Sequence, residues 1–502
     1  MKKIVYIIVC LTIIFGCENN EETQKAVAVE DDNFSQLTSL IDHFAEENLS
    51  KGNANSFAVA VYRDGKMYQN YYGTINGNQT NKPNDSSLYE IASITKTFTG
   101  SLVAKAVLAG KLNLDDDIRN YLEGDYPNLE FEGQPITIQH LLTHSLGFKT
   151  KTPPKLEAFN KRMNSGENID SIKPYTIQDL LEELKTVELN KKPGTHYAYT
   201  SVGPELLAYI LEKVNTKPFK EQLKIFLDDI GMHNTYLNES EKHLNNLVRG
   251  YDGEELAPVD YCPIYGAAGG AISTLPDLSI YMKYLIDNKE LPWVKEASRQ
   301  LFEDTEEDET VGYLWQNIGF AKEEGYYYSK TGTSNGIQSV VLICPDSNYG
   351  MIVFVNNTSD EAFNVWVNLT YRDIEPLLIK YPKLNLTSIF RKDFSDNPSI
   401  AFQNFRELKN DTINYSFSIR ELNNFGYDLL NEKQNEKAIK VFQFLTKEFP
   451  DNANLYDSLG EAFFISEEYD NALQNFKKAL QINPDMKSSK DYIKKIEEKK
   501  SK

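Results

Sequence analysis

The stretch "YYYSKTGTSNGIQSVVLICPDSNYGMIVFVNN", residues 326–357, alternates apolar runs with small groups of turn-forming residues. Runs of about four to eight residues that are rich in Val, Ile, Tyr and Phe and bounded by Gly, Pro, Asn or Ser are typical of β-strands. The stretch therefore predicts consecutive strands separated by turns.

The segments around it predict helices packed on a sheet. Residues 56–73, "SFAVAVYRDGKMYQNYYG", predict two strands joined at Asp64-Gly65, a dipeptide that favours a hairpin turn. Apolar residues recur at helical spacing in 34–49, between Ser93 and Gly110, after Thr274, and in 361–381. The order helix, hairpin, helical insert, strands, helix indicates an α+β fold with an antiparallel sheet and not a series of β-α-β units.

Three sequence elements whose side chains are suited to catalysis lie far apart in the chain. Ser93, in "ASITKT", is the only serine of the chain with a lysine three residues later, Lys96. On a helix this spacing puts both side chains on one face, and a serine hydroxyl becomes a good nucleophile when a neighbour takes its proton. Tyr199 lies in the loop before a helix that Pro204 can begin, and Lys330-Thr331-Gly332 lie on a predicted strand. The glycine would let a substrate backbone approach, and the lysine would supply a positive charge.

S-x-x-K, a Y-x-N-like element about 106 residues later and K-T-G about 131 residues beyond it resemble the serine β-lactamase and penicillin-binding protein superfamily. The similarity is greatest to its branch of class C β-lactamases, D-alanyl-D-alanine carboxypeptidases and related esterases. The stretches "ITIQHLLTHSLGF", "PGTHYAY", "IGMHNTYL" and "AAGGAISTLPDLSIYM" support it. The resemblance covers residues 33–382 and implies a β-lactamase-like antiparallel sheet, flanked by helices, with a helical subdomain.

The resemblance also implies roles for individual residues. Ser93 would attack a carbonyl group and become acylated, while Lys96 and Tyr199 would share the general-base role and then protonate the leaving group. Lys330 would stabilise developing negative charge and the anionic form of Tyr199. The backbone N–H groups of Ser93 and Thr333 would form the oxyanion hole, beside Thr331 and Gly332 in the substrate-binding strand. This chemistry needs no metal ion or organic cofactor.

Ser201 departs from the family pattern. Family members often have Asn at this third place of the Y-x-N element, where its amide can bind a substrate amide. Serine can still donate a hydrogen bond but has less reach, which weakens the expectation of β-lactam or peptide selectivity. Lys330 stands where many esterase-like relatives carry His, so a substrate with a carboxylate stays open.

Other residues carry weaker signals. His140 and His144 have a metal-like i, i+4 spacing but lack the Glu of H-E-x-x-H, so we do not expect a zinc site. The acidic stretch 303–309, "EDTEEDE", is typical of a solvated loop, with an approach for cationic substrates as the alternative. Cys344 lies in an apolar run and is expected to be buried. The net charge of −20 argues against nucleic acid as a partner.

The N-terminus predicts a targeting signal. Lys2 and Lys3 precede the apolar run 4–15, which is too short to span a bilayer but suits a signal peptide. The run ends in "IIFGC", which resembles the lipobox of bacterial lipoproteins. This implies cleavage after residue 16 and lipidation of Cys17; the alternative is a simple secretory signal. Residues 17–32 are expected to be a flexible tether, and the lipid would be the chain's only membrane contact, in a periplasmic or outer-membrane-associated envelope protein.

The C-terminal part carries an internal repeat. Pairs of like residues are spaced by 34 positions: Gly426 and Gly460, Ala438 and Ala472, Phe442 and Phe476, and Pro450 and Pro484. The repeat resembles the tetratricopeptide motif, which has this period and implies an all-α domain over 419–502 that ends in a polar capping helix. Residues 383–418 lack clear periodicity and are expected to be a linker.

These patterns allow two classes of function. The first is an envelope serine hydrolase that cleaves an amide or ester through an acyl-enzyme on Ser93. Its small-molecule or peptide substrate would be a D-peptide, a small ester or a β-lactam, with esterase or peptidase activity favoured over a dedicated β-lactamase. The second is a non-catalytic or weakly catalytic envelope binding protein that uses the cleft as a receptor. In both, the repeats would dock a protein or peptide partner.

Overall fold

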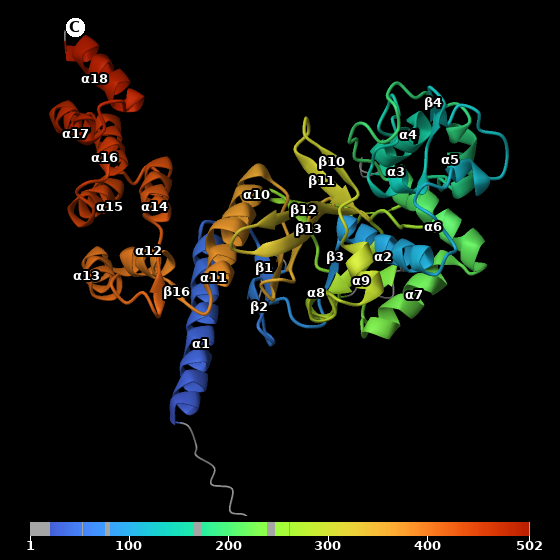
Figure 1. Cartoon of the computed structure of the whole chain (residues 1–502), viewed down its shortest axis with the longest axis horizontal. Helices are drawn as coiled ribbons and strands as arrows, with labels where there is room; N and C mark the ends of the chain where they lie inside the picture. The colour runs from blue at the N-terminus through green and yellow to red at the C-terminus, as the bar shows by residue number, and fades with distance from the viewer. Residues whose placement is uncertain are drawn as a thin grey trace, which may run out of the picture. The chain divides into compact units, whose positions relative to one another are not determined.

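The computed structural model describes residues 21–52, 54–75, 81–163, 172–237, 246–260 and 262–500. These residues form two compact units (Figure 1). The larger comprises Ile41–Ile379, and the other comprises the described residues before Ile41 and from Lys380 on. The predicted signal peptide and Cys17 lie outside the described residues.

The described residues of the larger unit include an eight-stranded sheet in which every neighbouring pair is antiparallel, as predicted. Its order is β10 (Phe302–Asp304), β11 (Glu309–Gly312), β12 (Trp315–Ala321), β13 (Gly325–Thr333), β14 (Gln338–Cys344), β15 (Tyr349–Val355), β1 (Ser56–Arg63), β2 (Lys66–Gly73). The hairpin predicted at Asp64-Gly65 joins β1 to β2, and both residues have positive φ, 49° and 85°. Such φ values give a tight turn whose twist matches that of the strands.

Successive residues of β2 contact helices on opposite faces of this sheet. Tyr68, Asn70 and Tyr72 all donate hydrogen bonds to Asp42 of α1 (Glu21–Ser50), whereas Gln69 donates to Ser279 of α8 (Leu275–Asp287). Alternation follows from the two-residue repeat of a strand. Because helices cover both faces, β1, β14 and β15 are buried along their whole length.

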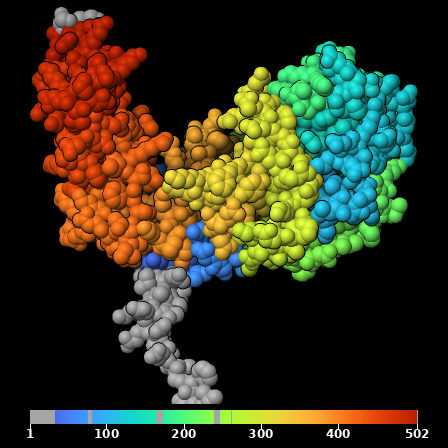
Figure 2. Space-filling view, viewed as in Figure 1, coloured from blue at the N-terminus to red at the C-terminus, as the bar shows by residue number. Residues whose placement is uncertain are grey.

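Helices and short strands complete the larger unit. The helices are α2 (Thr95–Leu108), α3 (Ile138–Leu142), α4 (Pro154–Met163), α5 (Ile177–Leu184), α6 (Val202–Asn215), α7 (Phe219–Ile230), α9 (Pro292–Ala297), α10 (Asp360–Val367) and α11 (Glu375–Lys380), the last two joined by a π-helical turn, Asn368–Ile374. Among the short strands, β9 (Ala271–Thr274) lies between β3 (Leu88–Glu90) and β6 (Tyr236–Leu237) and pairs with both. Two further pairs are β4 (Glu130–Phe131) with β5 (Gln134–Pro135) and β7 (Tyr251–Asp252) with β8 (Glu255–Leu256). In Figure 2 the helical insert, cyan to green, forms the surface beside the yellow strands of the sheet.

The acidic stretch 303–309 is not a simple solvated loop. It belongs to the hairpin of β10 and β11, and Asp304, the last residue of β10 before the turn, is buried. Asp304 accepts hydrogen bonds from the backbone N–H groups of Tyr197, Glu306 and Glu307. The prediction was wrong in part because charge density does not reveal a carboxylate that caps backbone N–H groups.

The second unit consists mainly of paired helices. They are α12 (Leu386–Asp396), α13 (Pro398–Leu408), α14 (Ile419–Asn431), α15 (Asn435–Glu448), α16 (Ala453–Ile465), α17 (Tyr469–Ile482) and α18 (Lys487–Lys500), with a short parallel pair of β16 (Leu384–Asn385) and β17 (Tyr415–Ser416). In each of the pairs α14–α15 and α16–α17, a glycine faces a phenylalanine ring. A Cβ on Gly426 would lie 2.4 Å from the ring of Phe442, and a Cβ on Gly460 would lie 2.7 Å from that of Phe476. The 34-residue spacing thus marks the same helix contact twice.

Two predicted boundaries need correction. Residues 383–418 are not a linker, because α12 and α13 lie there and share one hydrophobic core with α14 to α18. Phe402 of α13 stacks on Phe444 of α15 with 4.3 Å between ring centroids. These helices have 11 residues each and meet at Asn397-Pro398, so each is too short for its periodicity to be conspicuous. The tether predicted for 17–32 is helical from Glu21 on, where α1 begins. Among the described helices none is both long and apolar enough to cross a membrane.

Candidate active site

Ser93 lies at a sharp turn between a strand and a helix. It is the middle residue of a single helical turn, Ala92–Ile94, between β3 and α2. Ala92 has a φ of 43°, a conformation that costs a non-glycine residue about 1–3 kcal/mol. Lys96, one turn along and 1% exposed, donates a hydrogen bond from Nζ to Ser93 Oγ at 3.0 Å. The surrounding structure therefore maintains a strained turn that presents the Ser-Lys pair.

Tyr199 reaches the same hydroxyl from the loop before α6. Its OH donates to Ser93 Oγ at 2.6 Å, across 106 residues of sequence. His144 fixes this loop, because its carbonyl oxygen accepts from Ala198 N at 2.8 Å and its Nδ1 from Thr200 N at 3.4 Å. The ring of His144 also lies against that of Tyr199, with 4.5 Å between centroids. His144 thus positions the tyrosine.

Lys330 approaches Tyr199 from β13. Its side chain is fully buried, and Nζ lies 4.7 Å from the centroid of the Tyr199 ring. Nζ donates to Gln316 Oε1, and Gln316 Nε2 donates to the Tyr197 hydroxyl at 2.7 Å. Gln316 therefore holds Lys330 in place.

Gly332 has a structural role that differs from the predicted one. A Cβ there would lie 2.3 Å from the carbonyl oxygen of Ile91. The absence of a side chain lets β13 press against the backbone two residues before Ser93. This close approach sets the separation between the strand of Lys330 and the turn of Ser93, and the approach of a substrate backbone at Gly332 stays a prediction.

The two lysines change the acidity of Tyr199. Burial raises the pKa of Tyr199, but the ammonium groups of Lys330 and Lys96 outweigh it and lower the pKa to about 7. Burial in turn lowers the pKa of Lys330 to about 8, although the Tyr199 phenolate opposes this shift. Near neutral pH the tyrosine can therefore both accept and return a proton.

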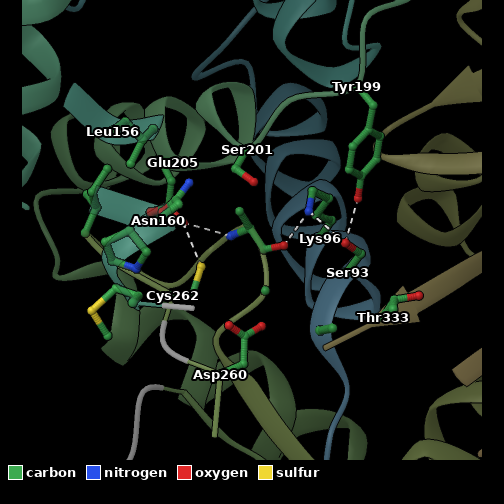
Figure 3. Close-up of a pocket in the computed structure, with 16 residues that line it drawn as sticks. Ser93, Lys96, Leu156, Asn160, Tyr199, Ser201, Glu205, Asp260, Cys262 and Thr333 are labelled. Carbon is green, nitrogen blue, oxygen red and sulfur yellow. Dashed lines mark hydrogen bonds between the residues drawn. The ribbon is translucent and has the colours of Figure 1, made fainter. Parts of the chain in front are cut away.

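Ser93, Lys96 and Tyr199 line a pocket of about 230 Å³. Figure 3 shows Ser93, Lys96 and Tyr199 on one side of it, with Ser201 above and Thr333 beyond Ser93. Of the remaining predicted residues, Thr331 and Gly332 pair with Val340 and Ser339 of β14. Both residues predicted to supply oxyanion-hole N–H groups, Ser93 and Thr333, line the pocket, and that role stays a prediction.

Some pocket residues carried no clear signal in the sequence. Glu205, Asn160, Asp260 and Cys262 line the pocket beside Ser201. Glu205 had one available signal: it is a charged residue within the apolar helix "PELLAYIL", and the structure shows it 2% exposed. The others lie on segments whose placement depends on tertiary contacts.

His140 and His196 have structural partners. His140 Nδ1 accepts from Thr137 N at 3.0 Å, and His196 Nδ1 lies 3.2 Å from Asp304 Oδ2. Within the described residues, no three His, Cys, Asp or Glu side chains are arranged to hold a metal ion. Within the described residues neither Cys262 nor Cys344 forms a disulfide, and Cys344 is buried, as expected.

Comparisons with known proteins agree with this fold. The chain is 24% identical to Protein flp of Staphylococcus aureus strain N315 over 330 residues, which are 64% of this chain and 63% of that protein. It is 23% identical to a beta-lactamase of Providencia stuartii, over 64% of this chain and 88% of that one. The match therefore spans less than two thirds of the Staphylococcus relative.

Solved structures share the fold at low sequence identity. A beta-lactamase/D-alanine carboxypeptidase from Yersinia pestis in complex with citrate matches with a TM-score of 0.56 and 22% identity, over 68% of this chain and 98% of that one. An octameric penicillin-binding protein homologue from Pyrococcus abyssi matches with a TM-score of 0.55 and 24% identity, over 66% and 76%. The family model described as beta-lactamase matches residues 37–368, well over half of the sequence. The chain therefore belongs to the beta-lactamase family, a family of serine hydrolases.

Proposed function

We propose that the larger unit is a serine hydrolase that cleaves an amide or ester bond through an acyl-enzyme on Ser93. One observation carries the proposal: Tyr199 OH and Lys96 Nζ lie 2.6 and 3.0 Å from Ser93 Oγ. Both distances allow direct proton transfer or charge stabilisation at the attacking oxygen.

The proton route follows from the acidity of the groups. With a pKa of about 7, Tyr199 is partly a phenolate at neutral pH and can take the Ser93 proton as Oγ attacks the carbonyl carbon. Its hydroxyl then returns the proton to the leaving amine or alkoxide as that bond breaks. Water, deprotonated by the same phenolate, attacks the acyl carbon, and Ser93 leaves with its proton restored. Lys96 and Lys330 stabilise the phenolate in both half-reactions.

The substrate we favour is a small ester or a D-peptide, ahead of a β-lactam. Ser201 lines the pocket and offers a short hydroxyl where family members often present an Asn amide. Relatives described as beta-lactamase and as beta-lactamase/D-alanine carboxypeptidase support an acyl-transfer reaction, and their low identity leaves the substrate open. The positive charge of Lys330 is compatible with a substrate that carries a carboxylate.

We further propose that the protein acts in the bacterial cell envelope, anchored by lipid on Cys17. We assign the 34-residue repeats of the second unit to the tetratricopeptide class, because two helix pairs repeat one glycine–phenylalanine contact. In this proposal the repeats bind a protein or peptide partner, and the substrate pocket works without it. A chain that ends at residue 385 should then keep full turnover, and loss of turnover would contradict this separation.

Labelling with a fluorophosphonate and with a fluorescent penicillin tests the proposed chemistry. The intact protein should be labelled by the fluorophosphonate, and Ser93→Ala should abolish labelling and lower ester turnover about 10⁴-fold or more. Ser86→Ala, in an exposed turn, is the matched control and should behave as the wild type. If neither the fluorophosphonate nor the penicillin labels the protein in a Ser93-dependent way, the proposal is refuted and a binding protein is favoured.

A further inference from the structure

Glu205 is a buried carboxylate next to the proposed catalytic groups. It lies on α6, six residues after Tyr199, and is 2% exposed at the wall of the Ser93 pocket. Its oxygens accept from Ala268 N at 2.9 Å and from Cys262 Sγ at 3.8 Å (Figure 3). They also accept from Tyr265 N at 2.9 Å. All three partners are donors, so the surroundings match a carboxylate, which only accepts.

The segment that Glu205 holds also contacts α2. The Ala268 carbonyl oxygen accepts a hydrogen bond from Lys96 Nζ, and the neighbouring Ala267 oxygen accepts from Thr99 Oγ1 at 3.1 Å. The two sides of residue 268 therefore face different partners: its N–H donates to Glu205, and its C=O accepts from Lys96. A shift of this segment would move the acceptor that orients the Lys96 ammonium group.

Lys96 needs such an orienting contact. A lysine carries its charge at the end of a flexible four-carbon chain, and burying that charge without polar partners is costly. Ser201, at the position where an Asn amide is common, is exposed and lies at the N-terminus of α6. In this chain the carbonyl of residue 268 and the carboxylate behind it supply polar surroundings for the lysine.

We propose that Glu205 is a positioning residue of the acyl-transfer site, which holds the 265–268 segment so that the Ala268 carbonyl directs Lys96 Nζ at Ser93 Oγ. The inference rests on the proposed hydrolase function. It gives a buried acid that belongs to none of the three sequence motifs a defined effect on catalysis.

The ionisation of Glu205 offers a specific readout. Burial raises its pKa to about 7, although the backbone N–H groups of Ala268 and Tyr265 and the charge of Lys96 oppose the shift. The titratable groups that face it are Lys96 on α2, Tyr265 at the start of the held segment and Cys262 three residues before that segment. A protonated Glu205 would present an O–H group to a set of donors and lose a contact. Activity should therefore require both the Glu205 carboxylate and the Tyr199 phenolate.

The test measures kcat and KM for a p-nitrophenyl ester from pH 5 to 9. Because two groups must lose a proton, the acid limb of log kcat against pH in the wild type should approach a slope of about two. Glu205→Gln should reduce kcat about 10²-fold with little change in KM, and its acid limb should fall to a slope of about one. Glu205→Asp keeps the charge and should keep the slope.

Glu212→Gln is the matched control. Glu212 lies on the same helix and accepts from the Tyr265 side-chain hydroxyl at 2.8 Å and from Phe219 N at 2.7 Å. It accepts from neither of the backbone N–H groups that Glu205 holds, those of Tyr265 and Ala268. It should leave kcat and the slope unchanged. A wild-type slope of one, or a folded Glu205→Gln protein that matches Glu212→Gln, would overturn the inference; if Glu205→Gln does not fold, the wild type and Glu205→Asp decide. Failure of the hydrolase proposal itself is distinct, because the wild type would then lack Ser93-dependent labelling.

Discussion

Two glycines show how differently the two units are built. A Cβ on Gly332 would collide with the backbone of Ile91, which is far away in sequence, whereas a Cβ on Gly460 would collide with the ring of Phe476, on the next helix. The first glycine brings a strand to the turn of Ser93. The second lets two consecutive helices approach. Close packing in the larger unit thus assembles a site from distant segments, and in the second unit it repeats a local contact.

The largest expected effect tests the long-range contact. Gly332→Val should lower ester turnover by about 10²-fold or more, because the clash with a backbone oxygen must displace β13 and hence Lys330. It should also destabilise the larger unit by about 3 kcal/mol, measured by urea unfolding. Gly133→Ala, at a turn where a Cβ would meet nothing but where φ is 77°, should cost about 1 kcal/mol of stability and leave turnover intact. Normal turnover in Gly332→Val would show that the close approach is dispensable.

The next effect concerns the charge that this contact places beside Tyr199. Lys330→Met removes a cation that lowers the pKa of Tyr199, so that pKa should rise from about 7 by about 1–3 units. In the proposed mechanism the phenolate is the active form, so activity is lost as pH falls, and the acid limb of the pH–rate profile should move to higher pH by that amount. Lys105→Met is the control, because Lys105 also lies over aromatic rings but away from Ser93. An unmoved acid limb would mean that Lys330 does not act on the base.

A smaller effect tests the local contact. Gly460→Val should destabilise the second unit by about 2 kcal/mol, because the Phe476 ring is also stacked on Tyr492 of α18 and has little room to move. Turnover of a p-nitrophenyl ester should not change. Ile465→Val, on the same helix and 47% exposed, should change neither quantity. A loss of turnover in Gly460→Val would break the contrast between the units.

The smallest effect concerns a charged contact between helices of the second unit. Glu448 accepts hydrogen bonds from Arg406 at 2.6 Å and Lys409 at 2.7 Å. Burial raises its pKa, but these two cations outweigh burial and hold the pKa below its usual value. Glu448→Gln should therefore cost about 1 kcal/mol at pH 7, and the difference from the wild type should disappear as pH falls below the pKa of Glu448 in the folded protein. The exposed Glu407→Gln is the control; a difference that persists in acid would exclude the ion pair as its cause.

The sequence alone was sufficient where the signal is local. The Asp64-Gly65 hairpin, the helix that ends before Gly110 and the helix capped by Thr274 follow from residues close together in the chain. The 34-residue spacing likewise located the helix pairs α14–α15 and α16–α17. The sequence did not reveal α12 and α13, because two short helices that meet at Asn397-Pro398 show little hydrophobic periodicity.

By itself the sequence determined that Ser93, Lys96, Tyr199 and Lys330 belong together, because their order and spacing match a family pattern. The tertiary structure decided what surrounds them: the His144 ring against Tyr199, the Gln316 side chain on Lys330, and the buried Glu205 behind Lys96. The physical reason is that these contacts join segments up to hundreds of residues apart, through burial and hydrogen bonds that no local pattern encodes. The sequence motifs identify the candidate reacting groups, and long-range packing sets the distances between them, the charges around them and the acidity of Tyr199.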